Sequence, residues 1–141
     1  MIRSPAGSSR RRDVEGAQAQ QVGREHVYSP PALDVARDTI VLGASRGGTS
    51  TVFAIGFDGH LKWWRDDLGK GRFRNNPQAI DADGRIFLTL DKTLFALKPD
   101  GTTLWSMQAQ SKFATSAIVA AGRLYVGTTD GRMYAIGGCP P

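Results

Sequence analysis

The chain has 141 residues, of which 40% are hydrophobic and 22% are charged, which is enough for one domain of ordinary size. Its 17 Gly and 7 Pro favour a turn-rich β architecture over a helical bundle, because both residues are costly inside helices. The net charge of +5 is spread thinly along the chain, so it does not point to a nucleic-acid partner. The lone Cys139 excludes an intrachain disulfide framework and a multi-cysteine metal site.

Residues 1–29 are predicted to form a disordered leader, because they are rich in Ser, Gly, Gln and Arg and have few aromatic side chains to bury. This segment contains no apolar stretch of the length that a secretory signal needs, and no run in the chain is long enough for a membrane span. The chain as given is therefore predicted to be soluble and to lack an export signal. Its compartment stays open, because a start site placed inside a longer gene would give the same sequence.

Short apolar strings repeat from residue 30 onward. The first strings are TIVLG (39–43), RIFLT (85–89) and RLYVG (123–127), and the second are VFAIGFDG (52–59), LFALKPDG (94–101) and MYAIGG (133–138). Upstream of them align PALDV (31–35), QAIDA (78–82) and SAIVA (116–120), and downstream align HLKWW (60–64) and TTLWS (102–106). The aromatic residues Phe53, Phe95 and Tyr134 give the period, which is 42 (95 − 53) and then 39 residues (134 − 95).

The turns between these strings carry Asp-Gly pairs at Asp58-Gly59, Asp83-Gly84, Asp100-Gly101 and Asp130-Gly131. Such pairs are typical of two-residue type I′ hairpin turns. Four short strings joined by tight turns within about forty residues indicate a propeller blade of four antiparallel strands. The predicted fold is therefore all-β: a partial propeller over residues 30–141, with blades at about 30–66, 76–108 and 115–138, of which the last lacks its outermost strand.

The strings at 52–63, 94–105 and 124–136 resemble repeats of the quinoprotein-like (PQQ-like) propeller family. The resemblance covers about residues 31–138 and implies a tryptophan that docks between neighbouring blades. Family members include dehydrogenases that use pyrroloquinoline quinone, the scaffold lipoprotein of the outer-membrane β-barrel assembly machinery, and extracellular sensor domains of kinases. Most of them work outside the cytoplasm, in the periplasm or beyond the cell.

The sequence departs from the dehydrogenase members, whose cofactor pocket lies on a complete eight-bladed ring and is often capped by disulfide-bonded cysteines, with a calcium ion nearby. Only one Cys and three blades are present, so no cofactor and no catalytic site are expected. The leading hypothesis is a non-catalytic segment of a larger propeller that serves protein interaction or scaffolding. The alternative is part of a PQQ-dependent dehydrogenase, in which the quinone and calcium would need the complete ring.

An arc of three blades leaves two terminal faces exposed, because each blade buries its faces on its neighbours. The expected partner is therefore another protein or the missing blades. A further hypothesis is that two copies of the chain associate into a six-bladed ring.

Two places in the sequence are candidates for interaction. Trp63 and Trp105 are predicted to pack between sheets, whereas Trp64 lies on the opposite face of its strand and is predicted to be an exposed contact. The second place is the basic and aromatic run that links the first two blades. The candidate interaction residues are therefore Trp64, Lys70, Arg72, Phe73 and Arg74.

Two further motifs each lack a residue that their function requires. The string GASRGGTS (43–50) has the glycine spacing of a phosphate-binding loop, but Thr49 stands where the lysine is required. We interpret it as a long hairpin loop. Asp81 and Asp83 resemble the start of a calcium loop, but its twelfth position is Lys92, so no bidentate Glu follows and a turn explains these residues better.

Overall fold

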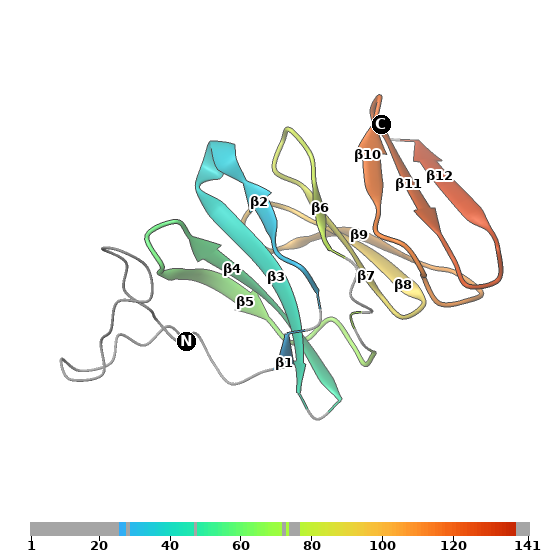
Figure 1. Cartoon of the computed structure of the whole chain (residues 1–141), viewed down its shortest axis with the longest axis horizontal. Helices are drawn as coiled ribbons and strands as arrows, with labels where there is room; N and C mark the ends of the chain where they lie inside the picture. Colours follow the sequence, from blue (N-terminus) through green and yellow to red (C-terminus); the bar gives the residue numbers. More distant parts are fainter. Residues whose placement is uncertain (1–25, 28, 47, 72, 74–76, 138–141) are drawn as a thin grey trace.

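The computed structural model describes residues 26–27, 29–46, 48–71, 73 and 77–137, and in this part the chain forms three antiparallel sheets side by side (Figure 1). Blade 1 comprises β1 (His26–Val27), β2 (Ala32–Asp34), β3 (Thr39–Arg46), β4 (Thr49–Gly56) and β5 (Leu61–Arg65). Blade 2 comprises β6 (Ala79–Ile80), β7 (Ile86–Leu90), β8 (Thr93–Leu97) and β9 (Thr103–Gln108). Blade 3 comprises β10 (Ile118–Ala120), β11 (Arg123–Gly127) and β12 (Met133–Gly137).

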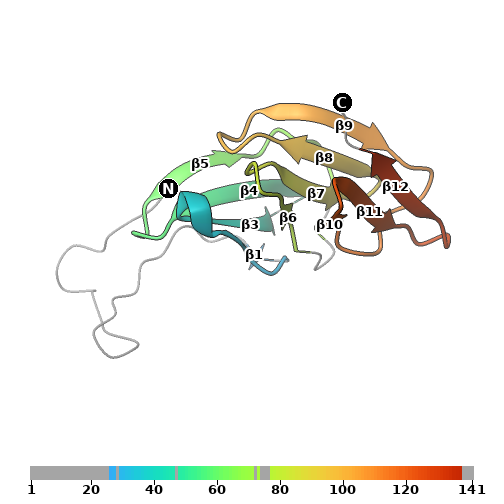
Figure 2. The same ribbon diagram turned by 90° about the horizontal axis from the view of Figure 1, so that it is seen from above.

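The sheets follow one another along an arc, and the prediction of an all-β propeller segment is confirmed. From β2 to β5, from β6 to β9 and from β10 to β12 the strands pair in chain order, which is the meander of a propeller blade, and β1 adds a second pairing to β3. Seen from above, β5 and β9 lie on one side of the arc, and β1 and β10 lie on the other (Figure 2). A single turn of 3-10 helix, Val35–Arg37, follows β2. Among the described residues no helix is long and apolar enough to cross a membrane.

Two apolar cores hold the arc together, one at each blade junction. The first lies between blades 1 and 2 and the second between blades 2 and 3. Every residue of β7 is buried, because the middle blade is covered on both faces. In contrast, β12 alternates between exposed and half-buried residues, as expected for a strand that is covered on one face.

The last residues of the predicted leader form part of blade 1 instead. β1 pairs with β3, so that Val27 lies opposite Ala44. The hydroxyl of Ser29, a buried residue, accepts a hydrogen bond from the Gly43 N–H at 2.7 Å. Thr115 accepts the same bond from the Gly127 N–H in blade 3 at 2.9 Å. Residues 26–27 and 29 therefore belong to the first repeat, whereas residues 1–25 lie outside the described part.

The Asp-Gly pairs do not form the predicted two-residue turns. In each of the four turns the glycine N–H donates to the carbonyl three residues before it, and the loop contains three residues. Only the glycines have a positive φ, for example 86° at Gly59, while their aspartates do not. This is a type I turn closed by a left-handed glycine. The pairs also differ in their place in the blade: Asp58 and Asp100 precede the last strands of blades 1 and 2, β5 and β9, whereas Asp83 precedes β7 and Asp130 precedes β12.

The string at 43–50 is also not a long loop. Arg46 pairs with Thr49 in the β3–β4 ladder, so the connection is two residues long. The hydroxyls of Ser45 and Ser50, both buried, hydrogen bond to each other across the two strands at 2.9 Å. These small polar residues therefore extend the hairpin, because each satisfies the other inside the sheet.

The first strand of blade 3 is shifted by one residue relative to that of blade 2. The turn between β10 and β11 has only two residues, Ala121 and Gly122, both with positive φ (51° and 75°). As a result Val119 pairs with Leu124, and Ile118 faces the opposite side of the sheet from Ile80, with which it aligns in sequence. A shift of one residue reverses the face of every side chain in a strand, and Ile118 is accordingly 62% exposed.

Candidate functional site

Of the five predicted interaction residues, two are exposed, one is buried and two lie outside the described residues. Trp64 lies on β5, is 50% exposed and pairs with Phe53 on the face of blade 1 that points away from blade 2. Lys70 is exposed and forms an isolated backbone bridge with Thr49. Arg72 and Arg74 lie outside the described residues. Phe73 is 2% exposed, so its ring is part of the core and the interpretation of Phe73 as a surface contact is wrong.

Phe73 is buried because it fills the first blade junction. Its ring lies so close to Gly43 that a Cβ at that glycine would be 2.8 Å away, and it shares the core with Leu88 and Val52. Phe113, forty residues later (113 − 73), is 1% exposed in the second junction. The recurrence of a basic residue followed by Phe at 72–73 and 112–113 is the signal that would have identified Phe73 as a repeat position.

Trp63 joins blade 1 to the turn between β8 and β9 of blade 2, as predicted. Its indole Nε1–H donates to the Pro99 carbonyl at 2.9 Å, and a Cβ at Gly101 would lie 2.7 Å from the ring. Arg65 supports the same contact, because its guanidinium donates to the carbonyl of Gly101 at 3.0 Å. Trp105 packs in the second junction, with its ring centroid 6.1 Å from that of Phe87. The turn that would correspond to residues 99–101 in blade 3 lies outside the described residues.

The turn aspartates are held by hydrogen bonds within their own turns. Asp100 accepts from the Thr102 hydroxyl at 2.7 Å and from its N–H at 3.0 Å, and these bonds lower the pKa of Asp100. The hydroxyl of Thr128 likewise lowers the pKa of Asp130, and the His60 N–H lowers that of Asp58. These carboxylates are therefore ionised acceptors that shape their turns.

Asp81, which resembled the start of a calcium loop, is also bound within its turn. It accepts from the N–H of Asp83 at 3.0 Å and from that of Arg85 at 2.8 Å, and it forms an ion pair with the Arg85 guanidinium at 2.6 Å. Its two oxygens are thus engaged by the chain itself. Across the part of the chain that the structure describes, no three metal-ligating side chains gather in one place.

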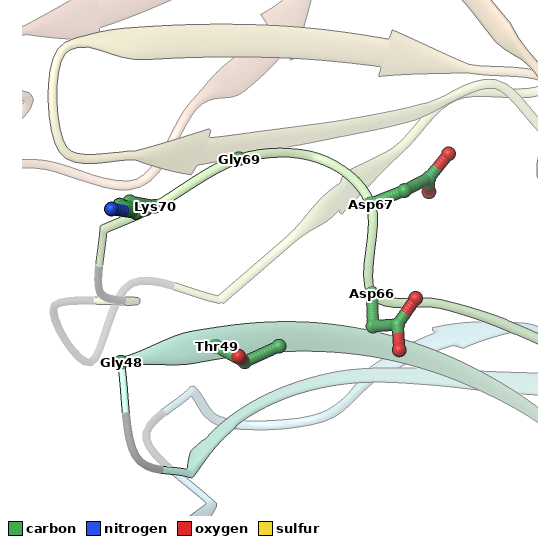
Figure 3. A pocket seen from close by; sticks show the side chains of 6 residues that line it. All are labelled: Gly48, Thr49, Asp66, Asp67, Gly69 and Lys70. Atoms are coloured by element: carbon green, nitrogen blue, oxygen red, sulfur yellow. The ribbon is translucent and has the colours of Figure 1, made fainter.

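An open hollow of about 490 Å³ lies at one end of blade 1, where the β3–β4 turn meets the segment after β5 (Figure 3). It is lined by Gly48, Thr49, Asp66, Asp67, Gly69 and Lys70. Figure 3 shows that Asp66 and Asp67 point away from Lys70. Asp67 is bound instead by Arg65 at 2.9 Å, which lowers the pKa of Asp67. The ammonium of Lys70 is thus not neutralised by the acids of this hollow.

Two more exposed lysines lie along the same end of the sheets. Lys92 is in the β7–β8 turn and Lys112 is in the segment between β9 and β10. We call Lys70, Lys92 and Lys112 the lysine row. Within the described residues no ion pair is formed by any of the three.

Backbone hydrogen bonds join the segments of Lys92 and Lys112 across blades 2 and 3. The Ala109 N–H donates to the Lys92 carbonyl, and the Thr129 N–H donates to the Lys112 carbonyl, both at 2.8 Å. Lys112 is tied back to blade 2 because the N–H of Phe113, its neighbour, donates to the Asp91 carbonyl at 2.8 Å. At the other end of the row, a Cβ at Gly71 would lie 3.0 Å from the Asp91 carboxylate. The backbones at Lys92 and Lys112 are therefore fixed relative to each other, and Lys70 lies next to them through the close approach of Gly71 to Asp91.

Comparisons with known proteins agree with this architecture. The family whose model matches residues 48–138 is described as outer membrane protein assembly factor BamB. Among solved structures, BamB from Moraxella catarrhalis is similar with a TM-score of 0.68 and 21% identity, over 86% of this chain and 37% of that chain. A candidate gluconolactonase has a TM-score of 0.55 and 15% identity, over 87% of this chain and 42% of its own.

A protein of unknown function from Bacteroides caccae has a TM-score of 0.54 and 11% identity, over 86% of this chain and 49% of its own. The chain thus spans less than half the length of each of these three structures. At these identities the likeness shows the fold. No curated protein matches the chain.

Proposed function

The chain belongs to the family of the outer membrane protein assembly factor BamB, and from that premise we propose that it is a non-catalytic propeller segment that binds an acidic segment of a partner protein. The observation that carries the proposal is the lysine row, three exposed lysines that form no ion pair with the residues the structure describes. The family description, which names an assembly factor, supports a role in protein interaction.

The charge of the lysine row determines the kind of partner. Backbone hydrogen bonds join the segments of Lys92 and Lys112, and Gly71, the neighbour of Lys70, lies close to Asp91, the neighbour of Lys92. An extended chain that crosses the blades would therefore meet the three lysines in succession. Exposed charges of this kind raise the association rate and select the sign of the partner. Ionised aspartates lie at both ends of the sheets, with Asp58 and Asp100 at the far end and Asp130 in the β11–β12 turn near Lys112.

The test measures the anisotropy of a fluorescein-labelled oligoglutamate peptide titrated with the chain. The double substitution Lys92→Glu with Lys112→Glu should weaken binding by roughly tenfold, because it reverses two of the three charges. The matched control is Lys98→Glu, an exposed lysine in the β8–β9 turn at the opposite end, and it should leave the affinity unchanged. Added salt should weaken binding of the wild-type chain.

Three results would contradict the proposal. The first is an oligoglutamate peptide that does not bind at all, and the second is an equal loss of affinity in the Lys98→Glu control. The third is a single-stranded oligonucleotide of matched charge that binds more tightly than the peptide, because that would indicate a nucleic-acid surface.

A further inference from the structure

A second pocket lies in the junction between blades 2 and 3, at the end of the sheets opposite the lysine row. It has a volume of about 240 Å³ and opens between the β6–β7 turn and the β10–β11 turn, which lie at the same end of the two sheets (Figure 1). Its apolar lining includes Phe87, Leu124 and Ile136, and its charged lining includes Asp83 and Arg85. We call it the junction pocket. Both of its walls belong to consecutive blades that share one apolar core.

In the junction between blades 1 and 2, an arginine of the chain fills the equivalent space. Arg37, at the end of the 3-10 turn after β2, lies over the β6–β7 turn of blade 2. A Cβ at Gly84 in that turn would be 2.7 Å from the guanidinium carbon of Arg37. The same guanidinium forms an ion pair with Asp34 at 3.4 Å. A guanidinium with a carboxylate partner therefore closes the first junction at this end.

At the second junction the described residues leave this space open. Gly122 in the β10–β11 turn corresponds to Gly84, since both have a left-handed φ, of 75° and 81°. The strands below correspond as well, because Val119 pairs with Leu124 where blade 2 has Ile80 in the same row. Among the described residues, no atom lies within 4 Å of a Cβ at Gly122. Val119 is accordingly 37% exposed.

The wall that blade 2 contributes to the junction pocket has an excess of negative charge. Arg85 is bound back to Asp81 of its own turn at 2.6 Å. Asp83 is reached by the same guanidinium only at 3.8 Å, and its side chain is 80% exposed. Arg123 also borders the pocket, but strand alternation places it on the opposite face of β11 from Leu124. Asp83 is therefore a carboxylate that can still accept a cation.

We propose that the junction pocket binds an arginine side chain of a partner protein, in the place that Arg37 takes in the first junction. The stem of that side chain would lie on the apolar lining, and its guanidinium would pair with Asp83. The volume suits one side chain, because pockets for drug-sized ligands measure roughly 300–1,000 Å³. This inference goes beyond the proposed binding function and can fail without it, because the pocket and the lysine row lie at opposite ends of the sheets.

The test is an NMR titration of the isotope-labelled chain with N-acetyl-arginine amide. The backbone amide signals of Asp83, Gly122 and Leu124 should shift and saturate together. N-acetyl-citrulline amide has nearly the same shape without the positive charge. It should bind roughly twofold to fivefold more weakly, which is the effect of losing one exposed ion pair.

Two variants separate the charge of the pocket from its shape. Asp83→Asn should weaken binding of N-acetyl-arginine amide by the same roughly twofold to fivefold, and Asn suits a turn, so the fold should be kept. Val119→Phe should abolish the saturable shifts, because the larger side chain fills the pocket. The matched control is Asp66→Asn, an exposed acid at the opposite end of the sheets, and it should leave the affinity unchanged.

Four results would overturn the proposal. The first is a titration without saturable shifts at Gly122 and Leu124, and the second is equal affinity for the arginine and citrulline compounds. The third is an equal loss of affinity in Asp83→Asn and Asp66→Asn. The fourth is tighter binding of N-acetyl-glutamate amide at the same signals, because that would indicate a site for an anion.

Discussion

At the scale of single residues, short polar side chains in this molecule act on the backbone next to them. Asp100 stabilises its turn through hydrogen bonds from Thr102, and Ser29 holds the Gly43 N–H that has no partner in β2. Such groups could be mistaken for catalytic or metal-binding residues when they are seen only in sequence. Their partners in the structure show that they serve the fold.

Replacement of Thr102 by Val should raise the pKa of Asp100 toward its ordinary value of 3.8, because the largest cause of the lowering is the Thr102 hydroxyl. The measurement is an NMR titration of the Asp100 side-chain carbon. The lowered pKa means that the carboxylate stabilises the folded state above the ordinary pKa, and that this contribution is lost as the pH falls through the lowered value. Asp58, whose bonds come from His60, should titrate unchanged, and an unchanged Asp100 would contradict the assignment.

Replacement of Ala121 by Asn should stabilise the chain by about 0.5–1 kcal/mol, because Ala121 has a φ of 51°, and Asn tolerates the left-handed region better than Ala. Urea unfolding measures the change. The matched control is Ala82→Asn in the three-residue turn between β6 and β7, where only Gly84 has a positive φ. A gain in the control equal to that at Ala121 would refute the role of the backbone conformation.

At the scale of elements, each blade is joined to the next by a side chain that enters the neighbouring sheet or turn. Trp63 crosses from β5 to the β8–β9 turn, and Phe73 and Phe113 fill the junctions from the connecting segments. Some turn glycines leave room for a packed side chain, whereas others only provide a backbone conformation with positive φ. One pair of substitutions separates these two roles of glycine, and a second pair tests the phenylalanines.

Gly101→Ala should destabilise the chain more than Gly131→Ala. Both glycines have a positive φ, of 91° and 86°, so both substitutions strain the backbone by about 1 kcal/mol. Only at Gly101 would the new Cβ lie 2.7 Å from the Trp63 ring, whereas at Gly131 nothing lies within 4 Å. Overpacking adds about 1–3 kcal/mol, which urea unfolding of the two variants would resolve. Equal losses would show that Trp63 does not rest on this turn.

Phe73→Ala and Phe113→Ala should each destabilise the chain by about 3–5 kcal/mol, the usual range for a buried phenylalanine. Both rings are nearly fully buried, with 2% and 1% exposure. A loss below about 1 kcal/mol at Phe73, measured by chemical unfolding, would return it to the surface role that its basic neighbours suggested.

The period near forty and the apolar alternation were sufficient to predict the blades, their order and the docking of Trp63. Turn geometry was harder to predict, because Asp-Gly fits both a two-residue and a three-residue connection and the choice depends on the register of the flanking strands. The position of Ile118 depends on the length of one turn, so alignment with Ile80 is not enough to predict which face of the sheet it lies on. Phe73 was assigned to the surface because basic residues surround it. Its equivalence to Phe113 in the next repeat would have indicated a buried position.

Only one residue of the lysine row was predicted from the sequence. Lys70 was identified because it lies in a basic run, whereas Lys92 and Lys112 are isolated in sequence. They join Lys70 only when the segment after β9 folds back on the β7–β8 turn. A surface assembled from three separate segments leaves no local pattern in the sequence.

At the scale of the whole molecule, the arc consists of sheets that each cover one face of the next. A single sheet of this size would leave both faces in water, and the two cores form only between blades. The central claim is therefore that consecutive blades pack face to face in a fixed register. The lysine row and the junction pocket both depend on it.

Nuclear Overhauser contacts in isotope-labelled protein test that claim most directly. The account predicts cross-peaks from the Trp63 indole ring to the Gly101 Hα and from the Phe73 ring to the Gly43 Hα, together with those across each ladder. Cross-strand peaks such as those between Leu88 and Phe95 serve as the internal standard. A spectrum with the ladder peaks present and both junction peaks absent would contradict the packed arc.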